Sequence, residues 1–296
     1  MVFNEVPTSP SANADYILGH SSFALSAISF PVNENTVRRP SGMCLVNGQL
    51  YIVEAGFHRA TVRDLPISSN NTAAVAVLGQ TSFTTSSSGT ALDNFWGPNK
   101  CYSDGTRLWV SMLNKDNVYQ WDTLPAMTNA SDNPAADYNL GLGAATNGDT
   151  GFENPYSMVM HGGRLFVADL NNARVKGFNS VPSSTAPSYD FILGASDSGG
   201  TTSSRLNAPR GLASNGSDKL YVSESNNHRI SIYKDIDGSN TPLIDSVIGQ
   251  INFTTGNPND SGSSIGFYEP GDIRYHQGRL IIADVRNGRV LIIPAP

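Results

Sequence analysis

The sequence predicts an all-β fold built from five copies of one repeating unit, and three observations support this prediction. A proline recurs at intervals of 54 to 61 residues along the chain. The apolar runs between these prolines are short, end at Gly, Asn or Asp, and lack the 3.6-residue period of a helix. Four of the five copies carry a carboxylate followed five residues later by an arginine. The prolines that open the copies are Pro40, Pro98, Pro155, Pro209 and Pro270.

Each copy contains four short apolar runs in the same order, which we interpret as four strands. The first run begins at the proline and ends at a turn such as Asn47-Gly48, and the third begins at the arginine, as at Arg229. The second run is Leu-aromatic-Val or a close variant of it, at 50–53, 108–110, 165–167, 220–222 and 280–282. The fourth run ends near a glycine, at Gly19, Gly79, Gly141, Gly194 and Gly249.

A repeat that holds four strands is typical of a β-propeller blade. The sequence therefore predicts a five-bladed β-propeller of four-stranded antiparallel blades, formed by residues 1–296 as one domain. The chain opens with a fourth-strand element at 15–19 and ends with a third-strand element at 289–293, so we expect these two ends to pair and complete one blade. A segment at 1–7 resembles the end of a further third strand, which leaves one such element in surplus.

Charge and composition argue against some binding partners and favour one cellular location. The net charge is −6 and no basic block occurs, which argues against nucleic-acid binding. No apolar run approaches the 18 residues that a membrane helix needs, so we expect no membrane insertion. The first ten residues lack the features of a secretory signal. The abundance of Ser, Thr, Asn and Gly nevertheless favours an extracellular or cell-surface location, with a signal peptide already removed.

Two cysteines, Cys44 and Cys101, lie at neighbouring places in successive copies. A disulfide between them is conceivable, although two reduced thiols in the core are the interpretation that the sequence favours. Asn-x-Ser/Thr sequons occur in predicted loops or near strand ends and support an extracellular location only weakly. They lie at Asn70, Asn129, Asn215, Asn252 and Asn259.

The carboxylates and arginines admit two interpretations. In the first, a ring of carboxylates binds a cation such as Ca²⁺, which takes oxygen ligands. In the second, each carboxylate pairs with its own arginine and stabilises the turn between the second and third strands. The second copy has Met112 and Asn117 at these two positions, and the joint loss of both charges favours a structural ion pair. The predicted pairs are Glu54 with Arg59, Asp169 with Arg174, Glu224 with Arg229, and Asp284 with Arg289.

Other chemistry finds little support. His58 and His228 share one turn position, and His161 and His276 share another, but two histidines of non-adjacent copies do not form a zinc site. No Gly-x-Ser-x-Gly turn and no phosphate-binding glycine loop occurs. We therefore predict no catalytic residue, no metal ligand and no required cofactor.

Aromatic residues divide into two groups. Tyr51, Trp109, Phe166 and Tyr221 recur at one strand position and are predicted to pack in the core. A second group lies near the opening prolines and is the candidate ligand-binding set, because aromatic rings on loops can stack on a sugar or a peptide. Packing beneath the loops is the alternative role for this set. It consists of Phe95, Trp96, Tyr156, Phe267 and Tyr268.

The repeats resemble the NHL-repeat family of β-propellers. The resemblance rests on Pro209-Arg210-Gly211, the strand 220–223 and Asn227-His228-Arg229-Ile230, with similar elements at 165–169 and 172–175. The elements at 78–83 and 248–253 resemble the Leu-Gly-Gln-x-x-Phe form that is common in bacterial versions.

The resemblance implies a propeller but no single activity. We expect a non-catalytic binding or scaffold protein that recognises a protein, peptide or glycan on its loop face. The alternatives are a structural protein that self-associates through its terminal strand and a metal-dependent lyase or hydrolase.

Overall fold

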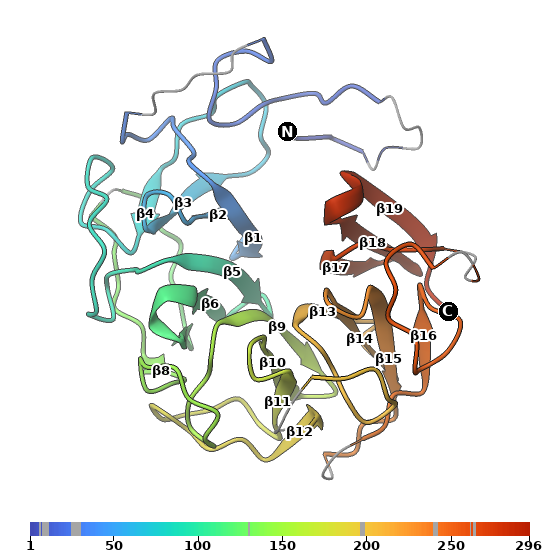
Figure 1. Cartoon of the computed structure of the whole chain (residues 1–296). Coiled ribbons are helices and arrows are strands. Elements are labelled where there is room, and N and C mark those ends of the chain that lie inside the picture. Colours follow the sequence, from blue (N-terminus) through green and yellow to red (C-terminus); the bar gives the residue numbers. More distant parts are fainter. Residues whose placement is uncertain are drawn as a thin grey trace. The chain divides into compact units, whose positions relative to one another are not determined.

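A computed structural model describes residues 1–5, 7, 12–24, 31–129, 131–195, 199–238, 242–260, 262 and 265–296. In this part of the chain the structure consists of β-strands and two short 3₁₀ turns, η1 (Leu113–Lys115) and η2 (Val285–Asn287). None of its helices is long and apolar enough to cross a membrane. The strands form five antiparallel sheets, and Figure 1 labels most of these strands.

Four of these sheets have four strands, and each corresponds to one predicted blade. Blade 1 contains β1 (Pro40–Val46), β2 (Gln49–Glu54), β3 (Arg59–Asp64) and β4 (Ala76–Leu78). Blade 2 contains β5 (Pro98–Ser103), β6 (Leu108–Met112), β7 (Asn117–Trp121) and β8 (Tyr138–Asn139). Blade 3 contains β9 (Pro155–His161), β10 (Arg164–Asp169), β11 (Arg174–Phe178) and β12 (Phe191–Gly194). Blade 4 contains β13 (Pro209–Ser214), β14 (Lys219–Glu224), β15 (Arg229–Lys234) and β16 (Ser246–Ile248).

Blade 5 has three strands in the described part of the chain, β17 (Pro270–His276), β18 (Arg279–Asp284) and β19 (Arg289–Pro294). Tyr16, which the sequence predicts in the fourth strand of this blade, forms an isolated antiparallel bridge with Val2. The predicted fold class of an all-β, five-bladed β-propeller is confirmed, but blade 5 lacks the predicted fourth strand in this part of the chain.

The chain divides into two compact units. The first comprises 1–110 and 119–137, and the second comprises 111–118 and 138–296. The division passes through blade 2 rather than through a linker, and the assignment of the whole chain to one domain stays a prediction.

The second strands of blades 1 to 4 supply much of the core, because almost all of their residues are buried. Tyr51, Trp109, Phe166 and Tyr221 are each at most 1% exposed, which confirms their predicted role. The turns that precede the first strands of the five blades share one backbone conformation. The residue before each opening proline has a φ of 50° to 64°, in the left-handed region that non-glycine residues seldom adopt. These residues are Arg39, Gly97, Asn154, Ala208 and Glu269.

Cys44 on β1 and Cys101 on β5 form a disulfide, with their Cα atoms 5.9 Å apart. The expectation of two reduced thiols was therefore wrong. The sequence places both residues on first strands but says nothing about the distance between neighbouring first strands. The packing of β1 against β5 brings the two side chains together.

Candidate functional site

The carboxylate and arginine of each pair face each other at the junction of the second and third strands. Register pairs Glu54 with Arg59, Asp169 with Arg174, Glu224 with Arg229 and Asp284 with Arg289. The closest nitrogen–oxygen distances are 3.3, 2.9, 2.7 and 2.7 Å, in that order. The structure thus brings together all four pairs that the sequence predicts.

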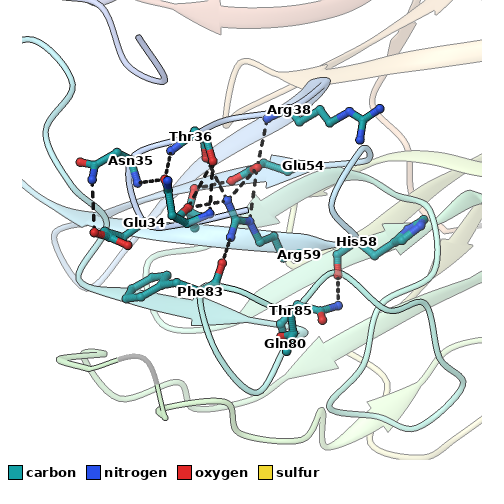
Figure 2. A network of polar contacts seen from close by, with 12 residues as sticks. Glu34, Asn35, Thr36, Arg38, Glu54, His58, Arg59, Gln80, Phe83 and Thr85 are labelled. Atoms are coloured by element: carbon teal, nitrogen blue, oxygen red, sulfur yellow. Dashed lines mark hydrogen bonds and ion pairs between the residues drawn. The ribbon is translucent and has the colours of Figure 1, made fainter. Parts of the chain in front are cut away.

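Each pair also fixes the loop that enters its blade, as Figure 2 shows for blade 1. Glu54 accepts a hydrogen bond from the backbone N–H of Arg38, two residues before the opening proline. The guanidinium of Arg59 donates to the backbone carbonyls of Asn33, Thr36 and Phe83. The equivalent N–H groups of Glu153, Asn207 and Tyr268 donate to Asp169, Glu224 and Asp284.

Burial raises the pKa of the Glu54, Asp169 and Glu224 carboxyl groups, and the neighbouring arginines oppose this change. The carboxylate oxygens are occupied by guanidinium and backbone N–H donors. No group of three or more His, Cys, Asp or Glu side chains in the described residues is arranged to hold a metal ion. The contacts of these carboxylates are those of structural ion pairs.

Blade 2 shows what happens where the pair is missing. Met112 and Asn117 are both fully buried, and both polar side-chain atoms of Asn117 lack a hydrogen-bond partner in the described structure. Trp96 occupies the place that Tyr268 has in blade 5, two residues before the opening proline. Here the second strand carries Met112, which offers no carboxylate to the Trp96 N–H.

The histidines at the shared turn position bind the loop that enters the next blade. The Nδ1 atom of His58 accepts from the backbone N–H of Gly97 at 3.2 Å, and that of His228 accepts from Glu269 at 3.0 Å. These hydrogen bonds require neutral rings that carry their proton on Nε2. Burial lowers the pKa of both imidazoles, which favours the neutral state. Asp116 plays the same part in blade 2 by accepting from Asn154.

The second histidine position has no such role. His161 is buried, its Nδ1 lies 2.8 Å from the hydroxyl of Ser214, and its ring packs edge-on against Phe166. His276, at the end of β17, is exposed. The sequence did not predict the hydrogen bonds from backbone N–H groups to His58 and His228. The signal that could have indicated them is that each histidine directly precedes the arginine of its repeat.

The five aromatic residues of the candidate ligand-binding set lie in three different environments. Phe95 and Phe267 are fully buried beneath the loops, so both belong to the core. Tyr156 lies partly buried on β9, with the Arg210 guanidinium 5.8 Å from its ring centroid. Trp96 and Tyr268 are 40% and 37% exposed on loops that enter blades 2 and 5.

Tyr268 is held by contacts on several sides. Its N–H donates to Asp284, its carbonyl accepts from the N–H of Arg286, and its ring lies 5.4 Å from the His228 ring at 83°. The neighbouring Glu269 forms an ion pair of 3.0 Å with Arg286. The ring is therefore presented to solvent by a backbone with little freedom, beside an oriented imidazole.

Comparison with known proteins supports the fold. The NHL repeat family model matches residues 206–233, which span β13, β14 and most of β15. No curated protein matches the chain. A chain from the crystal structure of a nidogen/laminin complex is similar over 88% of this chain and 77% of its own length, with 14% identity and a TM-score of 0.50. A chain from a streptogramin B lyase structure shows 10% identity and a TM-score of 0.45 over 91% of this chain and 85% of that one.

Proposed function

Because the chain is a β-propeller that carries an NHL repeat, we propose that it is a non-catalytic binding protein of the extracellular space or cell surface. Its binding residues are the exposed aromatic rings of the loops that enter the blades, Trp96 in the first unit and Tyr268 in the second. A protein, peptide or glycan is the partner.

The presentation of Tyr268 is the observation that carries this proposal. A ring exposed to water and attached to a fixed backbone loses little conformational entropy when a ligand stacks on it. The His228 ring beside it has Nδ1 engaged by Glu269, so Nε2–H is the donor left for a partner. An aromatic face with an adjacent hydrogen-bond donor suits a sugar ring or a peptide side chain.

Trp96 in the first unit shares two features with Tyr268, its exposure and its place two residues before an opening proline. It is the most exposed of the three tryptophans, because Trp109 and Trp121 are at most 1% exposed. The N–H of the next residue, Gly97, donates to His58, which places an imidazole beside this loop as well. An exposed aromatic residue followed by a backbone N–H that donates to a histidine therefore occurs in both units, which supports the use of both rings in binding.

The disulfide supports the proposed compartment. Disulfides persist in oxidising environments and are rare in the cytosol of most organisms. Cys44 and Cys101 are both engaged, and no free cysteine occurs in the described residues.

The test is a binding measurement with two defined probes, an array of immobilised oligosaccharides and an array of immobilised peptides. We expect the native chain to bind members of one array, and we expect Trp96→Ala and Tyr268→Ala each to weaken that binding at least tenfold. Because Trp96 is the exposed tryptophan, binding should also shift the fluorescence of the native chain but not that of Trp96→Ala.

Phe23→Ala is the matched control, because Phe23 is also an exposed aromatic residue, at 51%. It should leave binding unchanged. Full binding by the Trp96→Ala, Tyr268→Ala double variant would show that these rings are not the binding residues. If the native chain binds neither the oligosaccharide array nor the peptide array, the proposed classes of partner are wrong.

A further inference from the structure

Arg210 on β13 carries a guanidinium group that has no oxygen acceptor among the described residues. Its Nε–H is buried and lacks a hydrogen-bond partner, and no ion pair to this side chain occurs in that part of the chain. Arg210 is half-buried, so a ligand can reach the guanidinium from solvent. Other arginines of the second unit donate to carboxylates, side-chain amides or backbone carbonyls. They are Arg164, Arg174, Arg229, Arg274, Arg286 and Arg289.

The ring of Tyr156 on β9 supports this guanidinium. The Cζ atom of Arg210 lies 5.8 Å from the centroid of the ring. A planar guanidinium over an aromatic ring is held in its orientation, while its N–H groups stay available at the edge of the plane. Tyr156 therefore orients Arg210 without neutralising its charge.

Both side chains start from a backbone that neighbouring strands fix. Figure 1 shows β9, β13 and β17 as neighbouring first strands of blades 3, 4 and 5. The carbonyl of Tyr156 accepts from the Ser111 hydroxyl at 2.7 Å, and the N–H of Gly211, next to Arg210, donates to the Ser223 hydroxyl at 2.7 Å. Side chains on a fixed backbone lose less conformational entropy when they bind a ligand.

Carboxylates on the neighbouring strands have arginine partners of their own. Glu224 on β14 lies 2.7 Å from Arg229, and Asp272 on β17 lies 3.4 Å from Arg274. Neither carboxylate forms an ion pair with Arg210 in the described structure. The positive charge of Arg210 is thus left for an anion that the described residues do not supply.

We propose that Arg210 and Tyr156 form a binding site for a carboxylate group of a ligand. The Nε–H and one terminal N–H of a guanidinium lie along one edge, and a carboxylate accepts both in two parallel hydrogen bonds. The buried Nε–H lacks an acceptor in the free chain, so a carboxylate that accepts from it removes an unfavourable contribution. A single guanidinium balances one negative charge, which favours a carboxylate over a phosphate that carries nearly two.

Ligand-detected NMR titrations with matched acidic and neutral probes test this proposal. One pair of probes is methyl glucuronide and methyl glucoside, and the other is N-acetylglutamate amide and N-acetylglutamine amide. Each acidic probe carries a single carboxylate that its neutral counterpart lacks. We expect one acidic probe to bind the native chain at least tenfold more tightly than its neutral counterpart. The pair that shows this preference identifies the carboxylate as that of a sugar or of a peptide.

Variants of the two residues link this preference to the site. Arg210→Gln should weaken binding of the acidic probe at least tenfold. Arg210→Lys should restore only part of the affinity, because an ammonium keeps the charge but not the two parallel N–H groups. Tyr156→Leu should weaken binding at least threefold, because the guanidinium loses its aromatic support. Arg279→Gln is the matched control, since Arg279 is an exposed arginine of the same unit, and it should leave binding unchanged.

The urea concentration at the midpoint of unfolding shows whether Arg210 has a structural role instead. Arg210→Gln should keep the midpoint of the native chain, and a clear fall would overturn the proposal. Equal binding of acidic and neutral probes, or no binding of either acidic probe, would also overturn it. An equal loss of binding in Arg210→Gln and Arg279→Gln would do the same. The site uses neither Trp96 nor Tyr268, so its failure would leave the proposed binding function untouched.

Discussion

The Glu224–Arg229 pair of blade 4 offers the sharpest test of the structural interpretation. Both side chains are fully buried, and the closest nitrogen–oxygen distance is 2.7 Å. We consider Glu224→Met and Arg229→Asn, alone and together, because the double variant copies the residues that blade 2 carries at Met112 and Asn117.

The expected magnitudes follow from burial and from the contacts of the guanidinium. Either single change leaves a buried charge without its partner, which costs about 3–5 kcal/mol. Arg229 also donates to the carbonyls of Thr201, Arg205 and Phe253, so its loss leaves these groups without that donor in every variant that lacks it. The double variant retains this cost but strands no charge. We therefore expect it to lose about 3–5 kcal/mol, whereas the two single losses sum to about 6–10 kcal/mol, which corresponds to a coupling of about 3–5 kcal/mol.

The assay is urea denaturation at pH 7, followed by fluorescence and circular dichroism, with the free energy of unfolding taken only where both signals give the same transition. The control is the exposed Lys234–Asp245 pair of the same blade, at 3.1 Å. Lys234→Met should cost less than about 1 kcal/mol, as is usual for a surface ion pair. Additive losses for Glu224→Met and Arg229→Asn would refute the pairing argument.

Three further predictions concern the disulfide, a buried lysine and metal ions. The Cys44–Cys101 disulfide closes a loop with a sequence separation of 57 residues, so its reduction should lower the free energy of unfolding by roughly 4 kcal/mol. The control is the Cys44→Ser, Cys101→Ser double variant, which reductant should not affect. A loss below about 1 kcal/mol when reductant is added to the native chain would contradict this prediction. Burial lowers the pKa of Lys176 from 10.5 to about 8. Between pH 8 and pH 10.5 the unfolded chain therefore binds more protons than the folded chain. The free energy of unfolding should rise with pH over this range, by up to about 3 kcal/mol relative to that of Lys176→Met. An unfolding free-energy difference that stays constant from pH 7.5 to 11 would rule this out. Removal of metal ions with EDTA should leave the midpoint of thermal unfolding unchanged, because arginines and backbone N–H groups occupy the buried carboxylates; a fall that Ca²⁺ reverses would instead support a cation site.

The sequence by itself determined the features that depend on local pattern. Strand lengths, turn positions and the five-fold repeat follow from the alternation of apolar runs with Gly, Asn and Asp, which acts over a few residues. The register of Glu224 with Arg229 is equally local, because a short turn joins their strands. For this reason the fold class and the four ion pairs could be predicted before the structure.

The tertiary structure decided the features that depend on contacts between separate elements. The Cys44–Cys101 disulfide required the packing of β1 against β5, and the contact between His228 and Glu269 required the loop of the next blade. Packing between elements also buries Phe95 and Phe267 and leaves their neighbours Trp96 and Tyr268 exposed. In the sequence all four are aromatic residues near a proline, and nothing there distinguishes the buried pair from the exposed pair. Blade 5 is the remaining case, because strand propensity predicts that β19 forms but not which strand pairs with its outer edge. Pairing and burial depend on distances between residues far apart in the chain, and no local pattern encodes those distances.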